Sequence, residues 1–504
     1  MPKITLISPA GKTVITAKSG ALLSELLLSG GSSLEMPCGG KGRCGKCKVR
    51  AEGGLSEITA EEIAALRPEE QSAGIRLACC TRLTGDATVW TEASPKAGQI
   101  QAVGIAGSFA KKPFFRNYGA AVDIGTTTLA ARLYGKEGLV SSAVSFNPQR
   151  LFGADVISRI HAAMEGNAEE LARCIRKEIA RLLTKMAGKA RLPVQEIDAM
   201  VITGNTAMLH LFAKADPAPL AAAPFQAKEL FGKTAEGKDF GLPCHAQAKI
   251  YLPRCISAFV GADITTALLA SGICDREETA LLADIGTNGE MALWHGGRLL
   301  CCSTAAGPAF EGAGLSCGMP GVTGAIDQIL VKDGKLVVHV IGDVPASGIC
   351  GSGVVDAAAA IKQLGWMDET GYLRSAEEII LAGEARLTQK DIRMVQLAKS
   401  AICAGVQTLL DTAGVEDESL QAFAVAGGFG SYLNLKNAAM IGLYPPKLES
   451  KAIVLGNAAL SGAVMLLENA DLICRSEQIA QCADTVDLSA DPVFMEQYVQ
   501  CMQF

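Results

Sequence analysis

Four cysteines near the amino terminus have a spacing that suits an iron–sulfur cluster. Cys38, Cys44 and Cys47 follow the pattern C-x5-C-x2-C, and Cys79 comes after 31 further residues. The loop around the first three is rich in glycine: Gly39, Gly40, Gly42 and Gly45. A cluster needs four converging thiolates, and small residues let backbone N–H groups approach the sulfurs. The pattern therefore predicts a [2Fe-2S] cluster held by the four cysteines, and with it one-electron transfer.

Two alternatives to this ligand set stay open. A structural zinc site usually shows two closely spaced cysteine pairs, whereas only Cys44 and Cys47 form such a pair here. Cys80 is the rival of Cys79 for the fourth position. The segment Leu77-Ala78-Cys79 resembles the place where ferredoxins carry this ligand, which favours Cys79.

The elements around the cysteines predict a small domain of β-grasp type. The sequence favours a hairpin, a short apolar helix, a helix that begins with a capping box and a late turn before a final strand. In order, these are Ile4–Leu6 with Val14–Thr16, Leu22–Leu28, the helix from Ala60 capped by Thr59 and Glu62, the turn Gly85-Asp86, and the strand Ala87–Thr91. We expect a ferredoxin-like domain at 1–93 and a linker at 94–117, where glycine and proline interrupt any periodicity.

A second motif occurs twice, 161 residues apart. Ala121-Val122-Asp123-Ile124-Gly125-Thr126 and Leu282-Ala283-Asp284-Ile285-Gly286-Thr287 are each an apolar strand that runs into Asp-Ile-Gly-Thr. An aspartate at a strand end can hold Mg²⁺ through water, while the glycine turn and hydroxyls donate to phosphate oxygens. We expect Asp123 and Asp284 at the metal. The phosphate-binding candidates are Gly125, Thr126, Thr127, Thr128, Gly286, Thr287 and Asn288.

Further candidates come from other glycine-rich segments. Ala424–Ala426 is an apolar strand followed by Gly427, Gly428 and Gly430, where the backbone can approach an adenosine closely. Gly204 and Asn205 are also expected to bind nucleotide, and Glu311 is a candidate for orienting the attacking water. Strands alternate with long helical patterns at Val156–Met186 and Gln389–Leu410, which indicates an α/β architecture.

The composition limits the function classes. A net charge of −6 over 504 residues does not favour nucleic-acid binding, which relies on a basic surface. The chain begins without a signal segment and has no run of 18 apolar residues, so we expect no membrane association. Its 17 cysteines without an export signal favour reduced thiols and a cytoplasmic location.

Together these motifs resemble one family over nearly the whole chain. The two Asp-Ile-Gly-Thr segments and the later glycine cluster resemble the phosphate and adenosine motifs of the ATPases that include actin, sugar kinases and heat-shock chaperones. The addition of an amino-terminal [2Fe-2S] domain resembles the reductive activators of corrinoid proteins. The resemblance implies a duplicated actin-like, ribonuclease H-like ATPase fold, with a first lobe at 118–275 and a second lobe with carboxyl-terminal closure at 276–504.

The resemblance also implies a function and partners. An ATP-hydrolysing activator of this kind returns a corrinoid protein of a methyltransferase system from Co(II) to Co(I), with a [2Fe-2S] cluster, ATP and Mg as cofactors and an external low-potential reductant as the electron source. The alternatives are an ATP-driven electron donor to another low-potential metalloenzyme and a nucleotide-switched redox adaptor. Longer family members carry an additional segment before the ATPase, so whether this chain forms a homodimer stays open.

Overall fold

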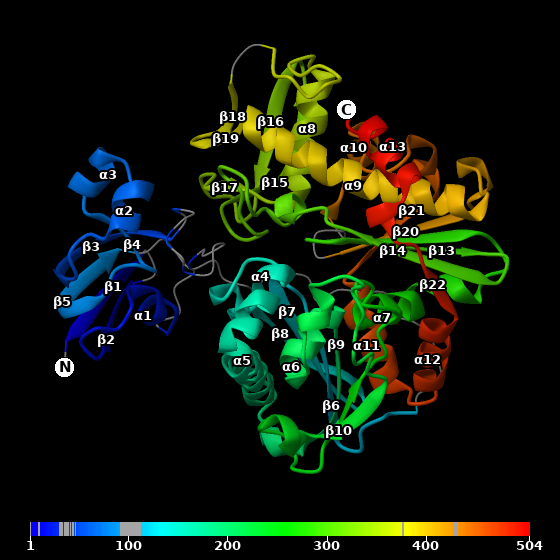
Figure 1. Cartoon of the computed structure of the whole chain (residues 1–504), viewed down its shortest axis with the longest axis horizontal. Coiled ribbons are helices and arrows are strands. Elements are labelled where there is room, and N and C mark those ends of the chain that lie inside the picture. Colours follow the sequence, from blue (N-terminus) through cyan, green and yellow to red (C-terminus); the bar gives the residue numbers. More distant parts are fainter. Residues whose placement is uncertain are drawn as a thin grey trace. The chain divides into compact units, whose positions relative to one another are not determined.

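The computed structural model of the chain describes residues 2–8, 11–29, 34, 40, 42, 45, 47–90, 112–374, 377–427 and 432–504 (Figure 1). Its contacts divide the chain into two units, one of residues 1–96 and 147–175 and one of 97–146 and 176–504, and each is described separately. Among these described residues, no helix combines the length and hydrophobicity that crossing a bilayer requires.

The amino-terminal sheet has five strands in the order β2-β1-β5-β3-β4. Its strands are β1 (Lys3–Ser8), β2 (Gly11–Thr16), β3 (Lys48–Leu55), β4 (Ile75–Leu77) and β5 (Leu83–Trp90). β1 pairs antiparallel with β2 and parallel with β5, and α1 (Leu23–Ser29) contributes Leu23 and Leu27 to the core. The predicted hairpin and apolar helix are confirmed.

The predicted capping box is also confirmed, and it belongs to a larger network. In α2 (Ala60–Ala65), the Thr59 side chain accepts from the Glu62 N–H, and the Glu62 carboxylate accepts from the Thr59 N–H at 3.0 Å. The fully buried Glu62 also accepts from Arg76 at 2.9 Å, from the Leu77 N–H at 2.9 Å and from the Thr81 hydroxyl at 3.0 Å. Although burial raises the pKa of Glu62, these hydrogen bonds lower it overall. One carboxylate thus fixes the backbone on both sides of Cys79.

The predicted turn at Gly85-Asp86 is wrong, because both residues lie inside β5. The pairing of β3 with β5 shifts register between Gly53 and Leu55, which marks a bulge. A Cβ atom on Gly54 would lie 2.3 Å from the Gly85 Cα. Glycine serves here to let two backbones approach each other, a use that local sequence does not distinguish from a turn.

The second unit contains two six-stranded sheets of related topology (Figure 1). The first has the order β10-β11-β9-β6-β7-β8, with β6 (Tyr118–Ile124), β7 (Thr128–Gly135), β8 (Gly138–Phe146), β9 (Ile197–Gly204), β10 (Lys233–Glu236) and β11 (Lys249–Leu252). The second has the order β21-β20-β12-β13-β14-β22, with β12 (Ala280–Ile285), β13 (Gly289–His295), β14 (Arg298–Thr304), β20 (Ala422–Ala426), β21 (Ala452–Gly456) and β22 (Ala483–Thr485).

Each sheet is an antiparallel three-strand meander that continues into two parallel strands on one side. β6, β7 and β8 form the first meander and β9 and β11 its parallel extension, while β12, β13 and β14 are followed in the same way by β20 and β21. This repetition fits the duplicated actin-like fold that the resemblance implies. Each predicted strand–turn–strand segment is confirmed.

A smaller substructure is inserted between β14 and the long helix α9 (Gln389–Ala413). It contains β15 (Ala325–Lys332), β16 (Lys335–Val340), β17 (Gly348–Ile349), α8 (Gly351–Gln363), β18 (Glu378–Ala382) and β19 (Ala385–Thr388). α9 confirms the helical pattern predicted from Gln389. A buried cluster of apolar side chains joins α8, α9 and the second sheet.

The helix expected over Val156–Met186 is interrupted. The chain forms α4 (Val156–Ala162), a short irregular turn at Ala163–Asn167 and α5 (Ala168–Lys189). Gly166 lies inside the turn with a φ of 100°, a conformation that no helical residue adopts. The apolar periodicity continues through this glycine, which is why the pattern predicts one helix.

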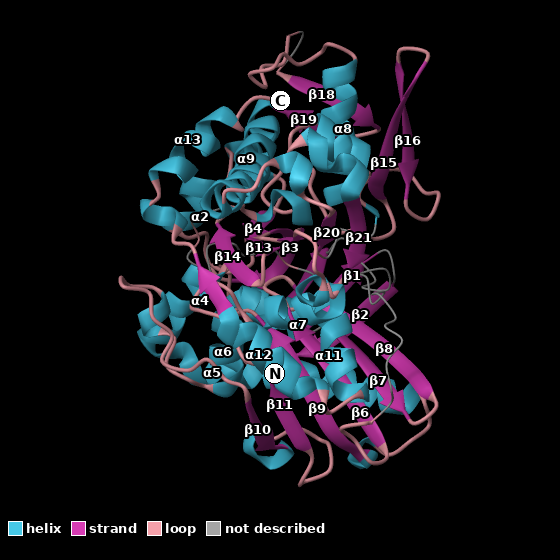
Figure 2. Cartoon of the chain, turned by 90° about the vertical axis from the view of Figure 1, so that its right-hand side faces the viewer, coloured by secondary structure: helices cyan, strands magenta, loops and turns pink. Residues whose placement is uncertain are grey.

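Two helices pack closely in the core of the second unit. α7 (Ala262–Ser271) and α11 (Ala458–Glu468) lie side by side in both views (Figure 1, Figure 2). Their apolar side chains join one buried cluster with residues of both sheets. A Cβ atom on Gly462 would lie 1.9 Å from the Thr266 carbonyl oxygen, so glycine permits the close approach of the helices.

This contact predicts a destabilised variant. Gly462→Ala should lower the free energy of unfolding by about 1–3 kcal/mol, because the obstructing atom is backbone and cannot rotate away. Gly188→Ala in α5 is the matched control, since its Cβ would meet nothing within 4 Å; it should raise stability slightly, as alanine is the better helix former. Urea unfolding measures both variants, and equal effects of the two substitutions would contradict the packing argument.

Candidate functional site

The structure brings two of the four predicted cluster cysteines together. Cys47, at the start of β3, and Cys79, after β4, are buried, and their sulfur atoms are 3.2 Å apart. The Cys80 sulfur lies 3.6 Å from that of Cys79 and is half-buried. Cys38 and Cys44 lie outside the described residues. The closer, more buried pair supports Cys79 rather than Cys80 as the fourth ligand.

The described glycines of the loop suit a cluster. Gly40, Gly42 and Gly45 have φ values of 81°, 69° and 63°, in the left-handed region that favours glycine. The Gly42 N–H donates to the Cys79 sulfur, as predicted for an amide near a cluster. The hydrogen bond with Cys47 and burial raise the pKa of the Cys79 thiol, so binding iron through both sulfurs would require the metal's positive charge to stabilise the thiolates. These features fit an iron–sulfur cluster.

The first repeated hairpin places Asp123 at the end of β6 and Thr126 in the turn. The Gly125 N–H donates to the Thr128 carbonyl at 2.9 Å, which closes the turn. Asp123 accepts a hydrogen bond of 2.8 Å from the side-chain amide of Asn457, the N-cap of α11. Asn205, the N-cap of α6 (Thr206–Ala213), donates to the Thr126 hydroxyl at 3.3 Å. The predicted residues Asn205 and Thr126 are therefore in contact.

The predicted Gly204 ends β9 directly before Asn205. A Cβ atom there would lie 2.7 Å from the Ile124 carbonyl oxygen. Glycine is thus required for β9 to approach the first turn, which brings Asn205 to Thr126. Gly204 supports this arrangement through its backbone.

The second hairpin repeats the turn and is tied to Glu311. The Gly286 N–H donates to the Asn288 carbonyl at 2.9 Å. The Thr287 hydroxyl donates to the Glu311 carboxylate at 2.7 Å, and its N–H donates at 3.2 Å. The Thr127 hydroxyl of the first hairpin donates to the same carboxylate at 2.6 Å. Glu311 therefore joins the two predicted phosphate turns.

Two further carboxylates, not predicted as site residues, lie near Asp123 and Asp284. Glu290 is almost fully buried and stands directly opposite Asp284 in the β12–β13 pair. Asp263 is half-buried in the first turn of α7. The sequence could have indicated Glu290, because in a hairpin with this turn it pairs with Asp284, and directly opposed residues lie on the same face of the sheet. No comparable pairing reaches Asp263, which depends on how α7 packs.

Burial raises the pKa values of all four carboxylates, and neighbouring charges add to the rise in Asp263, Asp284 and Glu290. Burial raises the pKa of Asp123 to about 6, against a hydrogen bond from Asn457 that lowers it. Burial and the charges of Asp123 and Glu311 raise that of Asp284 to about 7. Burial and the charges of Asp284 and Asp123 raise that of Asp263 to about 8, and Glu290 is raised well above its usual range, chiefly by burial. These carboxyl groups therefore hold their protons to a higher pH than free carboxyl groups do.

The donor chemistry fits Mg²⁺ held at a distance. Within the described part of the chain, no three His, Cys, Asp or Glu side chains are arranged to ligate a metal ion together. Mg²⁺ dehydrates reluctantly and is bound through one or two carboxylates, with water and phosphate oxygens as the remaining ligands. Asp123 and Asp284 fit this water-mediated role.

The raised pKa of Asp263 predicts a pH effect on stability. The unfolded chain releases this proton near pH 4 and the folded chain near pH 8, so the folded state holds the extra proton between these values. Wild type should lose stability relative to Asp263→Asn as the pH rises through this window, and the difference should level off above it. Thermal unfolding of both proteins in Mg²⁺-free buffers measures the difference. A stability difference between the two proteins that does not change with pH, or that changes in the opposite direction, would contradict the raised pKa of Asp263.

The third predicted segment is described only in part. β20 ends at Ala426, and Gly427 follows with a φ of 122°; its Cβ would lie 2.3 Å from the Ile285 carbonyl oxygen. Gly428 and Gly430 lie outside the described residues. The chain re-enters the description before α10 (Leu435–Met440), whose N-cap is Asn434.

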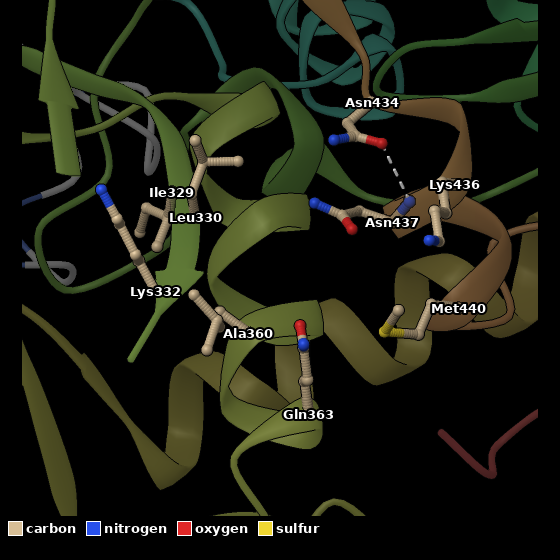
Figure 3. A pocket seen from close by; sticks show the side chains of 10 residues that line it. Ile329, Leu330, Lys332, Ala360, Gln363, Asn434, Lys436, Asn437 and Met440 are labelled. Atoms are coloured by element: carbon tan, nitrogen blue, oxygen red, sulfur yellow. Dashed lines mark hydrogen bonds between the residues drawn. The ribbon is translucent and has the colours of Figure 1, made fainter. Parts of the chain in front are cut away.

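A pocket of about 420 Å³ lies between α10, β15 and the end of α8 (Figure 3). Its walls combine apolar side chains with amides and two lysines: Ile329, Leu330, Val331, Ala360, Met440, Gln363, Asn434, Asn437, Lys332 and Lys436. The Asn437 amide nitrogen donates to the buried Asp356 at 2.7 Å, which leaves its amide oxygen as an acceptor. Apolar walls with a few fixed polar groups suit a flat heterocycle.

Three family models match consecutive parts of the chain. One for the 2Fe-2S iron-sulfur cluster binding domain matches residues 7–84, one for the RACo middle region matches 118–276, and one for the C-terminal ASKHA domain of RACo matches 278–504. The first model lies within the amino-terminal domain, and the other two span both six-stranded sheets.

Known proteins match over two thirds or more of the chain. The chain is 30% identical to the corrinoid activation enzyme RamQ of Eubacterium limosum, with 99% of both chains covered. It is 28% identical, over 68% of each chain, to a reductase of the Co(II) methylated amine-specific corrinoid protein from Methanosarcina barkeri. A solved reductive activator for a corrinoid, iron-sulfur protein matches with a TM-score of 0.74 and 26% identity, covering 99% of this chain and 98% of that one.

Proposed function

This chain belongs to the family of reductive activators of corrinoid proteins, and we propose that it uses ATP to drive the reduction of a corrinoid protein from Co(II) to Co(I). The observation that carries the proposal is the union of two sites in one chain. A buried pair of thiols lies beside a ferredoxin-type sheet, and two threonine turns are joined by Glu311 close to buried acidic side chains. The reduced corrinoid would serve a methyltransferase system.

The electron-transfer site is assigned to Cys38, Cys44, Cys47 and Cys79. A [2Fe-2S] cluster at this position supplies single electrons at a potential near roughly −400 mV. The chain contributes the sulfur ligands and the Gly42 N–H, which stabilises negative charge on the Cys79 sulfur. The Glu62 network holds the backbone around Cys79 in place. An external low-potential reductant is the proposed electron source.

The ATPase site is assigned to the two hairpins. Asp123 and Asp284 would hold Mg²⁺ through water, and Asn457 orients Asp123. The hydroxyls and backbone N–H groups of both turns would donate to phosphate oxygens: Gly125, Thr126, Thr127, Thr128, Gly286, Thr287 and Asn288. Glu311 is placed to accept a proton from the attacking water once its threonine partners have turned to the phosphates.

The adenine base is assigned to the pocket beside α10. Asn434, Lys436, Asn437 and Met440 of this pocket follow the predicted adenosine segment by a few residues in the sequence, which supports the assignment. Asn437 would accept from the exocyclic amine of the base, while Ile329 and Met440 cover its faces.

This assignment predicts that filling the pocket weakens ATP binding. Met440→Trp should raise the dissociation constant for MgATP by about tenfold or more, because the indole takes the volume of the base. Calorimetric titration measures the affinity, and Val337→Trp, at an exposed position of β16, is the control. If Met440→Trp binds MgATP with unchanged affinity, the adenine base does not bind in this pocket.

ATP is needed because the electron must be delivered uphill. For one electron, each additional gap of roughly 59 mV between the reduction potentials of the cluster and the Co(II) acceptor costs about 1.4 kcal/mol. A conformational change of the two hairpins on binding MgATP would favour one state of the corrinoid partner over another and so make the transfer favourable. The many free thiols of the described residues support a reducing, cytoplasmic setting for this chemistry.

The proposal is tested by the response of ATP hydrolysis to the partner. Phosphate release should be slow for the protein alone and should accelerate when a Co(II) corrinoid protein is added under anaerobic conditions. The same partner already in the Co(I) state should stimulate less, because it no longer needs activation. A hydrolysis rate that ignores both forms of the partner would contradict coupling.

A further inference from the structure

Glu311 collects hydrogen bonds from both phosphate turns. Its carboxylate accepts from the hydroxyls of Thr127 and Thr287, at 2.6 and 2.7 Å, and from the Thr287 N–H at 3.2 Å. Thr127 lies in the turn of the first sheet and Thr287 in the turn of the second. One side chain thus bridges the two halves of the ATPase.

The fold fixes Glu311 in this place. Residue 311 ends a short 3-10 turn, Pro308–Glu311, that begins at Gly307, and the Gly307 N–H donates to the Thr287 carbonyl at 2.8 Å. On the other side, Gly312 has a φ of 72°, and a Cβ there would lie 2.1 Å from the Met319 carbonyl oxygen. Both glycines are required by the backbone, so the carboxylate is directed at the threonines by a constrained segment.

The threonines cannot serve Glu311 and a phosphate together. A hydroxyl has one proton to donate, and the Thr127 and Thr287 hydroxyls both donate theirs to Glu311. The carboxylate and the phosphates are also both negative, and like charges at this distance repel. Binding of the phosphates to these hydroxyls and the Glu311 bridge therefore exclude each other.

We propose that Glu311 is a latch that holds the two ATPase hairpins together and that ATP must displace. This inference rests on the proposed nucleotide site and adds its regulation. The energy of breaking the bridge is taken from phosphate binding, so the latch lowers nucleotide affinity and links ATP binding to movement between the two sheets. Once released, the carboxylate is free to act on the attacking water.

The first test measures the bridge without nucleotide. Hydrogen exchange of the segment 124–128 should be faster in Glu311→Gln than in wild type, because the hairpin loses a charged partner. Exchange of β15, at 325–332, is the internal control and should not change. Equal exchange of 124–128 in the two proteins would overturn the latch, whatever the protein binds.

The second test measures affinity for a non-hydrolysable analogue, AMP-PNP with Mg²⁺. Glu311→Gln should bind it about tenfold more tightly than wild type, since the analogue no longer competes with a charged acceptor. In a Thr127→Val background the same substitution should give a smaller gain, because one arm of the bridge is already missing. If Glu311→Gln raises AMP-PNP affinity as much with Thr127→Val as without it, the effect comes from charge removal alone, and the cross-sheet latch is overturned. No gain in affinity in the wild-type background would overturn it as well.

The two tests separate the latch from the site on which it rests. If wild type fails to bind AMP-PNP, the proposed nucleotide site is wrong, while the exchange experiment still decides whether the bridge exists. If Glu311 only orients water, hydrolysis falls in Glu311→Gln while exchange and analogue affinity stay at the wild-type level. That result contradicts the latch.

Discussion

Replacing Cys79 by serine should remove the iron–sulfur cluster and abolish reduction of the corrinoid partner. The Cys79 sulfur lies 3.2 Å from that of Cys47, and the Gly42 N–H donates to it. Hydroxyl is a far harder ligand than thiolate and is a poor substitute on iron. We expect anaerobically purified Cys79→Ser to lose the visible absorption of the cluster and to form Co(I) at least about 10²-fold more slowly. Binding of MgATP should be unaffected.

Cys80→Ser is the matched control for this variant. The Cys80 sulfur lies 3.6 Å from that of Cys79 but is more exposed, so the same substitution one residue later should leave the iron content and spectrum unchanged. Iron and sulfide analysis, with electron paramagnetic resonance of the reduced proteins, separates the two variants. Loss of the cluster in Cys80→Ser with retention in Cys79→Ser would show that the fourth ligand is Cys80.

Replacing Asp284 by asparagine should abolish ATP turnover and leave the cluster intact. Asp284 ends β12 beside the second phosphate turn, and the charges of Asp123 and Glu311 act on it. Asparagine keeps the shape and removes the charge that would hold Mg²⁺. We expect phosphate release to fall by about 10²–10³-fold, the loss typical of removing one charge-stabilising group from an active site.

The control for Asp284→Asn changes an exposed carboxylate of the same unit. Asp333 lies in the β15–β16 turn with a φ of 51°, a conformation that asparagine also tolerates, so Asp333→Asn is the control. It should hydrolyse ATP at the wild-type rate. Cluster absorption in both variants checks the fold. Turnover that survives in Asp284→Asn would move the metal site elsewhere, and loss of the cluster together with turnover would indicate misfolding.

Local patterns predicted much of the fold. The capping box at Thr59 and Glu62 and both Asp-Ile-Gly-Thr hairpins form as expected, because each depends on contacts between residues close in sequence. The wrong predictions concern glycine. Gly54 permits the backbone of β3 to approach Gly85 in β5, and Gly166 interrupts a helix, but a turn, a bulge and a helix break are alike in local sequence.

The site is harder to predict from the sequence, because the positions of several of its residues depend on how distant helices and turns pack together. Glu290 was within reach of sequence reasoning, since it opposes Asp284 across a short hairpin. Asp263 and Asn457 reach Asp123 and Asp284 from the starts of α7 and α11, and their positions follow from how these helices pack around Gly462. The bridge from Glu311 to Thr127 spans 184 residues, and no pattern within either segment indicates it.

The central claim is that ATP drives an electron that the chain does not otherwise deliver. The direct measurement mixes the anaerobic, chemically reduced protein with a Co(II) corrinoid protein and follows the absorption of Co(I). We predict that Co(I) accumulates with MgATP and does not accumulate with AMP-PNP or without nucleotide. Equal accumulation of Co(I) in the absence of ATP would contradict the account.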